Sequence, residues 1–263
     1  MTRDGLLIVN ADDWGIDTQT TAAIRRCRDA SAVSSVSAMV FMAGSAEAAQ
    51  AAAGEALSAG LHINLTEPFT ADAIDARVRA RQGRLAEHFG GPHWRRFGLS
   101  PGLFTELEHA IEDQLVEFRH LYAREPSHFD GHEHIHQALG VLAARTLPAG
   151  ARMRPSFTYS PGEKPYANRC LRGLLNRLIR LRFTAPRYFF SIRDLHPALG
   201  GHALEEKLAL AGGSTVEVMT HPGWADERAI LLDPAWADLI GQRRLGGYED
   251  LSAPAGHRGR FLT

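Results

Sequence analysis

Strand-length apolar runs alternate with helical patterns along this 263-residue sequence. Residues 6–9 form a continuous apolar run, which is typical of a strand buried on both faces. We expect further strands at residues 36–42, 60–65, 127–130, 188–192 and 215–220. Repeated strand–helix units favour an α/β fold with a parallel sheet or a (β/α) barrel.

Helical periodicity separates these runs. The best pattern covers residues 103–122, where Leu107, Ile111, Leu115 and Phe118 share one face. Other helices are expected at residues 18–28, 45–53, 139–147 and 204–211, with Ser45 as the N-cap of the second. Residues 66–101 predict loops and short helices. No repeat or linker divides the sequence, so we expect a single domain over residues 1–263.

Composition narrows the class of protein. The formal net charge of -1 argues against a nucleic-acid binder. Two distant cysteines, Cys27 and Cys170, do not support a disulfide framework and fit a reducing cytoplasm. Neither a signal peptide nor an apolar stretch of ~20 residues is apparent, so we expect a cytoplasmic protein. The thirteen histidines point toward metal and proton chemistry.

Two adjacent aspartates, Asp12 and Asp13, follow the first strand. Neighbouring carboxylates repel each other and lose solvation when buried, and a metal ion offsets both costs. Because neighbouring side chains in extended backbone point in opposite directions, one aspartate could bind metal while the other faces substrate. The alternative is a turn or a helix N-cap.

Histidines carry the next two motifs. His62 and Asn64 share one face of the strand at residues 60–65, where His62 is either a ligand or a hydrogen-bonded core residue. Three histidines then alternate at His132, His134 and His136. A strand would place all three on one face, and a helical turn would bring the first beside the last.

These imidazoles suit divalent transition metals. Asp130 or Glu133 could orient a ligating ring from behind. The alternative for this motif is an exposed histidine loop.

The fourth motif places His221 at the end of a strand and before Pro222. A histidine there suits a general acid, or is a loop residue with its own hydrogen bonds. Arg154 could orient a catalytic carboxylate or form a surface ion pair. Trp14 and Trp224 could stack on a sugar ring or lie in the core.

The polar motifs share one position in the pattern. Asp12, Asp13, His62, His132 and His221 all fall near the carboxyl ends of predicted strands. In barrels of parallel strands those ends carry the active site. We therefore expect these side chains to meet at one rim.

A basic segment spans residues 164–187, with seven basic residues and no acidic one. One helical face would carry Leu171, Leu174, Leu175 and Leu178, and the other Arg169, Arg172, Arg177 and Arg180. A basic amphipathic helix can lie on an anionic membrane surface. The alternative is a helix packed on the barrel with a solvated arginine face.

Together, four stretches resemble the YdjC-like carbohydrate deacetylases, the family of chitooligosaccharide and hopanoid-associated deacetylases. They are LLIVNADDWG (6–15), GLHINLT (60–66), PSHFDGHEHIH (126–136) and EVMTHPGW (217–224). The resemblance runs over residues 6–250 and is loose at 68–102. It implies a distorted (β/α) barrel of the NodB/YdjC type with mostly parallel strands, and one divalent metal ion, magnesium or zinc. The implied ligands are Asp13, His62 and His132.

The resemblance also implies an activity: removal of the N-acetyl group from an N-acetylated amino sugar, with release of acetate. By analogy with the NodB-type enzymes, Asp12 would be the general base, Arg154 would hold it, and His221 would be the general acid. The expected substrate-binding residues are Trp14, Asn64, His134, His136 and Trp224. The family also suggests a homodimer.

Two other functions fit parts of the pattern. One is a metal-dependent phosphoesterase or another amidohydrolase, because His-x-His near carboxylates also occurs there. The other is a sugar-binding protein without catalysis, against which Asp12 and His221 count, because neither is needed merely to bind sugar.

Overall fold

The computed structural model describes residues 5–251, apart from residues 56, 93–94, 97 and 99. Residues 1–4 and 252–263 of the expected domain, and four positions of the 66–101 segment, therefore lie outside the described residues. Within the described part, no helix is both long enough and apolar enough to cross a bilayer.

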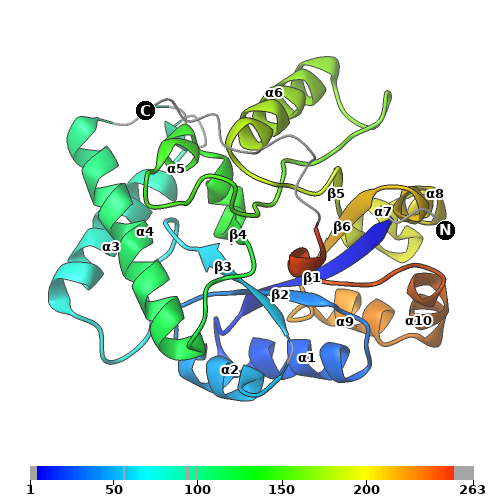
Figure 1. Ribbon diagram of the computed structural model, residues 1–263, viewed down its shortest axis with the longest axis horizontal. Coiled ribbons are helices and arrows are strands. Elements are labelled where there is room, and N and C mark those ends of the chain that lie inside the picture. The colour runs from blue at the N-terminus through cyan, green and yellow to red at the C-terminus, as the bar shows by residue number, and fades with distance from the viewer. Residues whose placement is uncertain (1–4, 56, 93–94, 97, 99, 252–263) are drawn as a thin grey trace.

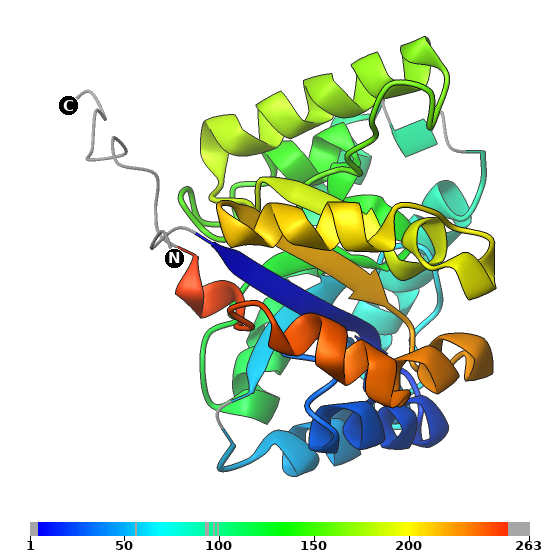
Figure 2. The ribbon, with the colours of Figure 1, turned by 90° about the vertical axis from the view of Figure 1, so that its right-hand side faces the viewer.

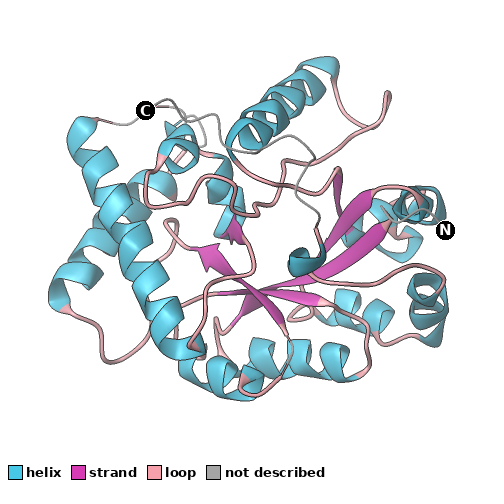
Figure 3. Cartoon of the chain, in the orientation of Figure 1, coloured by secondary structure: helices cyan, strands magenta, loops and turns pink. Residues whose placement is uncertain are grey.

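Six parallel strands form one sheet in the order β4-β3-β2-β1-β6-β5. They are β1 (Leu6–Trp14), β2 (Ser35–Ala38), β3 (Ser58–Ile63), β4 (Phe129–Gly131), β5 (Tyr188–Ser191) and β6 (Thr215–Thr220). The sheet curls into a half-barrel with helices around it (Figures 1 and 3). The expected α/β fold with a distorted, parallel barrel is confirmed.

Helices connect the strands and cover the outside of the curl (Figures 1 and 2). The longer ones are α1 (Thr18–Asp29), α2 (Ser45–Ala52), α3 (Ala76–Phe89), α4 (Pro101–Tyr122), α6 (Tyr166–Arg182) and α10 (Pro234–Gly241). The shorter ones are α5 (Leu139–Ala143), α7 (Ile192–Leu195), α8 (Leu204–Ala209) and α9 (Ala225–Leu231). The 3₁₀ segments are η2 (His132–Gln137), which a kink divides, η3 (Pro197–Leu199), η4 (Leu210–Gly212) and η5 (Tyr248–Asp250).

Side chains on alternate positions of β1 face opposite sides of the sheet. Leu7 and Val9 join the main core, which packs beneath the surrounding helices. Leu6 and Ile8 face inward, where they pack against Tyr248 of η5. The inward face therefore begins apolar and becomes polar further along the strand, where Asn10 and Asp12 follow.

Several predicted bounds were wrong. The strand expected at residues 36–42 ends at Ala38, and it could not have reached residue 42, because Phe41 takes a left-handed backbone conformation with φ of 60°. The apolar pattern continues past the strand because Met39 and Met42 are buried against Phe69. Ser45 is not the N-cap of α2, since Gly44 holds that position. The Ser45 hydroxyl instead closes the preceding turn, accepting from the Met42 amide over 2.9 Å.

The structure also contains a helix that the sequence did not predict at its full length. Within the segment at residues 66–101, α3 spans 14 residues and is capped by Asp75, which accepts from the amides of Arg77 and Val78. Only Gln82, Leu85 and Phe89 are buried on it, so the apolar pattern is weak. The helices expected at 139–147 and 204–211 end earlier, at Ala143 and Ala209.

Candidate active site

Residues from all four polar motifs line one cavity of about 380 Å³ at the carboxyl ends of the strands. The motif residues that line it are Asp12, Asp13, His62, His132, His134, His221 and Trp224. The remaining lining residues are Gly131, Glu133, Ser191, Arg193 and Met219. The expectation that the motifs meet at one rim is confirmed.

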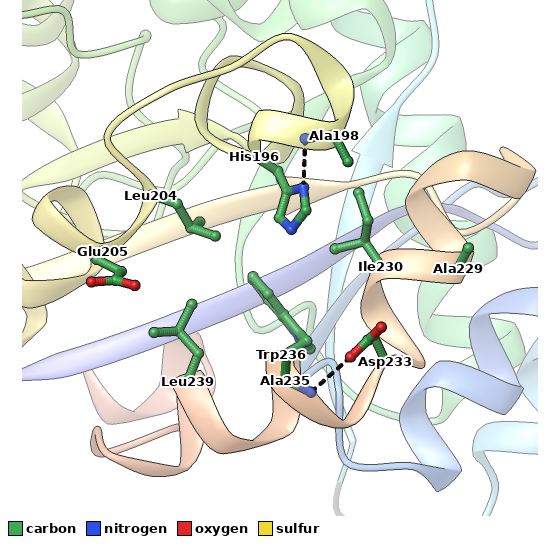
Figure 4. A pocket seen from close by; sticks show the side chains of 10 residues that line it. All are labelled: His196, Ala198, Leu204, Glu205, Ala229, Ile230, Asp233, Ala235, Trp236 and Leu239. Carbon is green, nitrogen blue, oxygen red and sulfur yellow. Dashed lines mark hydrogen bonds between the residues drawn. The ribbon is translucent and has the colours of Figure 1, made fainter.

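A larger groove of about 530 Å³ lies elsewhere, between α8, α9 and α10 (Figure 4). Its ionisable side chains are His196, Glu205 and Asp233. The His196 ring accepts from the amide of Ala198, and Asp233 accepts from the amide of Ala235. Because two of its three ionisable side chains serve as local caps and the rest of its wall is largely apolar, the smaller cavity is the better candidate for chemistry.

A β-bulge brings the aspartate pair into this cavity. Ala11 pairs with Val36, but the next paired residue of β1 is Trp14, opposite Ala38. The extra residue is accommodated at Asp13, which takes a φ of 69°. Bulges re-aim side chains that a regular strand would send to opposite faces. Both aspartates consequently line the cavity, so the predicted opposite orientation was wrong.

Asp13 lies between two histidine rings. Its Oδ1 atom is 3.1 Å from His132 Nδ1 and 3.5 Å from His62 Nε2. A ligand atom from each of these three residues lies within 4.8 Å of the other two. Two imidazoles and a carboxylate open to a cavity are a typical donor set for a catalytic divalent cation.

A second carboxylate stands behind each ring. His62 Nδ1 lies 2.8 Å from Asp130 Oδ1, and His132 Nε2 lies 3.4 Å from Glu67 Oε1. The hydrogen bond from His62 Nδ1 to Asp130 holds the proton on that nitrogen and leaves Nε2 free for a metal. Of the two residues expected to orient a ligating ring, Asp130 contacts the ring of His62, while Glu133 pairs with Arg96 over 2.9 Å.

The charges of this group favour a cation at its centre. Burial opposes charge on both rings, yet Asp130 and Asp13 raise the pKa of His62 to about 10, and Asp13 raises the pKa of His132. Burial also opposes ionisation of Asp13, but hydrogen bonds from the two histidines lower its pKa. The environment thus stabilises positive charge between the three side chains, which a bound cation would supply in place of protons. The residues present fit a metal.

A second close group, Asp12, His62 and Asp130, is less suited to a metal. Arg154 bonds to both of its carboxylates: to Asp12 through both terminal nitrogens, and to Asp130 over 2.7 Å. Their charge is therefore already compensated, and we assign the metal position to the group around Asp13.

Arg154 is fully buried and is not a surface residue. Besides the two aspartates, its Nε donates to Glu217 Oε1 over 2.7 Å. Tyr248 donates to the other Glu217 oxygen over 2.5 Å, and burial raises the pKa of Glu217 to about 7 against the effect of Arg154. Sequence reasoning missed Glu217, although a charged residue inside an apolar strand was a signal. Tyr248 had no comparable signal.

His221 directly follows β6 and lines the same cavity. Its backbone amide donates to the buried Glu227 carboxylate over 2.6 Å, and its ring Nε2 lies 4.0 Å from Asp12 Oδ2. The ring stacks on Trp224 with centroids 4.4 Å apart, and the Arg193 guanidinium covers the same indole at 4.5 Å. The imidazole of His221 therefore faces the cavity beside Asp12 and is oriented by its stacking on Trp224.

Comparison with known proteins identifies the family of this chain. A model of the YdjC-like protein family matches residues 6–254. The chain belongs to the YdjC-like family.

Curated relatives of this YdjC-like chain include the mouse carbohydrate deacetylase, 34% identical over 60% of this chain and 51% of the mouse protein. The chitooligosaccharide deacetylase of Citrobacter koseri is 29% identical over 84% of this chain and 82% of its own length. The matched region spans about half the length of the mouse and human relatives.

A solved structure from Enterococcus faecalis, described as that of a candidate cellobiose-phosphate cleavage protein, has the same fold. It superposes with a TM-score of 0.66 over 95% of this chain and 99% of its own, at 20% identity.

Five residues of this YdjC-like chain were expected to bind substrate, and the structure separates them. Trp224 is 48% exposed and lines the cavity, as does His134, which packs edge-on against Phe157. Trp14 was wrongly placed at the rim: β1 continues through the aspartates, and the indole is fully buried in the main core.

Asn64 and His136 were also wrongly expected in the cavity. The buried Asn64 carboxamide accepts from the amides of Thr66 and Glu67, and so shapes the loop after β3. His136 is fully buried because Glu133 and His134 take left-handed conformations, with φ of 48° and 58°. The segment therefore forms neither a strand face nor a regular helical turn: His132 and His134 line the cavity, and His136 is turned away from it.

Proposed function

We propose that this chain is a metal-dependent carbohydrate N-deacetylase, which hydrolyses the N-acetyl group of an amino sugar and releases acetate. The observation that carries the proposal is the cavity in which the Asp13, His62 and His132 group adjoins Asp12, held by Arg154, and His221. Membership of the YdjC-like family and relatives named as carbohydrate and chitooligosaccharide deacetylases support it.

Asp13, His62 and His132 would hold one divalent cation. When bound, that cation supplies Lewis-acid polarisation of the amide carbonyl and of the attacking water. Imidazole and carboxylate donors suit zinc, and magnesium is the second candidate. The hydrogen bond between His62 and Asp130 orients one of the two rings for either ion.

Asp12 acts as the general base in this proposal. Arg154 holds both carboxylate oxygens, so the carboxylate is fixed toward the cavity and remains available for the proton of the attacking water. His221 protonates the departing amine, and its position 4.0 Å from Asp12 places acid and base beside one reacting group. The exposed face of Trp224 offers a platform for a sugar ring.

The direct test is acetate release from N-acetylated mono- and oligosaccharides, measured after chelation and after return of zinc or magnesium. We expect release with at least one substrate and metal, and loss after chelation. Phosphate release from phosphomonoesters is measured in parallel with the metal content. Phosphate release in place of acetate, or two to three ions per chain, would favour the phosphoesterase alternative. Sugar binding without any release would favour a protein that has lost catalysis.

A further inference from the structure

Helix α6 lies along the outer edge of the molecule in both ribbon views (Figures 1 and 2). Leu175 and Ile179 are buried beneath it. On the opposite side Tyr166, Leu174 and Leu181 are 75%, 54% and 67% exposed. The helix therefore differs from the predicted one: its leucines do not share one buried face.

The outward residues form a continuous stripe. Positions 166, 170, 174, 177 and 181 follow each other at intervals of three or four residues, which places them on one helical face. Of the eight exposed large hydrophobic side chains in the described part of the chain, four belong to α6. They are Tyr166, Leu171, Leu174 and Leu181. Apolar surface gathered in this way marks an interaction surface.

Positive charge accompanies the stripe. The segment 164–187 contains seven basic residues and no acidic one. Arg180 and Arg182 donate to backbone carbonyls, and Arg172 donates to Gln137 and Ser156, so none of the three is neutralised. Arg169, Arg177 and Arg187 likewise form no ion pair with a carboxylate of the described residues. Among nearby acids, Glu163 pairs with Lys207, and Asp194 lies 4.0 Å from Lys164.

These charges decide between two occupants of the face. A second copy of the chain bound through α6 would be related by two-fold symmetry and would place the same arginines against each other. An anionic bilayer instead offers apolar acyl chains to the stripe and phosphates to the arginines. The exposed aromatic at Tyr166 is also typical of the level of lipid headgroups.

We propose that α6 docks this protein on an anionic phospholipid surface through Tyr166, Leu174, Leu181 and the flanking arginines. The inner side of the same helix reaches toward the candidate active site. Leu171, Arg172 and Leu175 line a pocket of about 310 Å³, which shares Glu133 and His134 with the metal cavity. Docking on α6 therefore brings the wall of the cavity close to the bilayer.

Vesicle co-sedimentation of the full chain tests the proposal, with phosphatidylcholine alone and with phosphatidylcholine containing phosphatidylglycerol. We expect binding to the anionic vesicles at low salt, loss of binding at high salt, and little binding to phosphatidylcholine. The double variant R169Q/R177Q is expected to bind anionic vesicles about 25-fold more weakly, at roughly fivefold per charge. L174S/L181S is expected to weaken binding by more than tenfold. V116S, which changes an exposed apolar residue on α4, is the matched control and is expected to bind as the parent does.

Circular dichroism and thermal unfolding show whether each variant remains folded, as expected for changes at exposed or half-buried positions. The proposal is overturned if the parent protein ignores anionic vesicles at low salt, or if L174S/L181S binds as well as V116S. Sedimentation velocity measures the oligomeric state and tests whether a second copy of the chain covers this face instead. If L174S/L181S turns a dimer into a monomer while the parent binds no vesicle, the face is a self-interface and the lipid proposal is wrong.

Discussion

Arg154 donates to both oxygens of Asp12, over 2.6 and 2.7 Å, at the bottom of the cavity. The same guanidinium also pairs with Asp130 and Glu217, so one buried cation serves three carboxylates. Bidentate pairing needs the planar fork of arginine, which a lysine ammonium lacks. Arg154 therefore both stabilises the barrel interior and positions the proposed base.

Arg154→Lys is expected to destabilise the metal-free protein by about 3–5 kcal/mol, because it leaves buried carboxylates without a partner. Urea unfolding measures the change. The control is Arg119→Lys, at an exposed pair with Glu125, where the expected change is below about 1 kcal/mol. Equal effects at the two positions would show that Arg154 does not compensate the buried charges.

Asp12 and Asp13 are neighbours with different proposed roles, and matched asparagine variants separate them. Asp12→Asn should retain the metal and lose activity by about 10²- to 10⁴-fold, because the amide cannot accept the proton of water. Asp13→Asn should lose metal and activity together. Metal content by mass spectrometry and acetate release are the two measurements. Metal loss in Asp12→Asn alone would reverse the assignment.

Asp130 and Glu133 were the two candidates for orienting a ligating ring, and the structure favours Asp130. Asp130→Asn is expected to weaken metal binding by about 10- to 100-fold, because His62 loses the carboxylate that fixes its Nδ1 proton. Glu133→Gln is expected to leave the affinity unchanged, since Glu133 pairs with Arg96 instead. Titration of the metal-free proteins with zinc measures both. The assignment fails if only the second variant binds more weakly.

His128 predicts a sensitivity to acid. Its ring is fully buried between Ser37, Ser127 and Tyr248, and burial lowers its pKa to about 3. The unfolded chain binds a proton near the ordinary value of about 6.5, whereas the folded chain does not. Stability from this group is therefore present above that value and is lost as the pH falls from about 6.5 toward 3.

Between these limits the parent protein should lose up to about 1.4 kcal/mol per pH unit more than His128→Gln. Chemical unfolding with chelator present throughout measures both slopes, so that metal release does not contribute. Parallel pH profiles would show that His128 is not kept neutral by the fold. Gly60 explains the depth of this burial, because a Cβ atom there would lie 2.3 Å from the His128 ring.

Much of the site follows from one rule about parallel strands. Their carboxyl ends meet at one edge, so Asp13, His62, His132 and His221 could be brought together without knowing any distance. The role of Arg154 was harder to predict, because the sequence was equally consistent with a surface ion pair. The structure shows that the guanidinium is buried among three carboxylates.

The errors share a different cause, local departures from regular backbone. Strand alternation was assumed for Asp12 and Asp13, and either a strand or a helical turn was expected for the histidines after β4, but positive φ angles at Asp13, Glu133 and His134 re-aim the side chains. The sequence did not predict the full length of helix α3, because few of its residues are buried. The pattern of apolar and polar residues indicates which side chains are buried. It does not predict an irregular backbone conformation or a helix that is mostly exposed to solvent.

The bulge in β1 has a consequence for how this scaffold tolerates change. The central strand of the sheet carries one residue more than its neighbour requires, and that residue is the proposed metal ligand. The residues between Ala11 and Trp14 are the two aspartates themselves, so a deletion that made the pairing of the two strands regular would also remove one of the two acids. An extra residue in the strand and a proposed functional residue are thus the same residue here, and a well-folded deletion mutant is expected to be inactive.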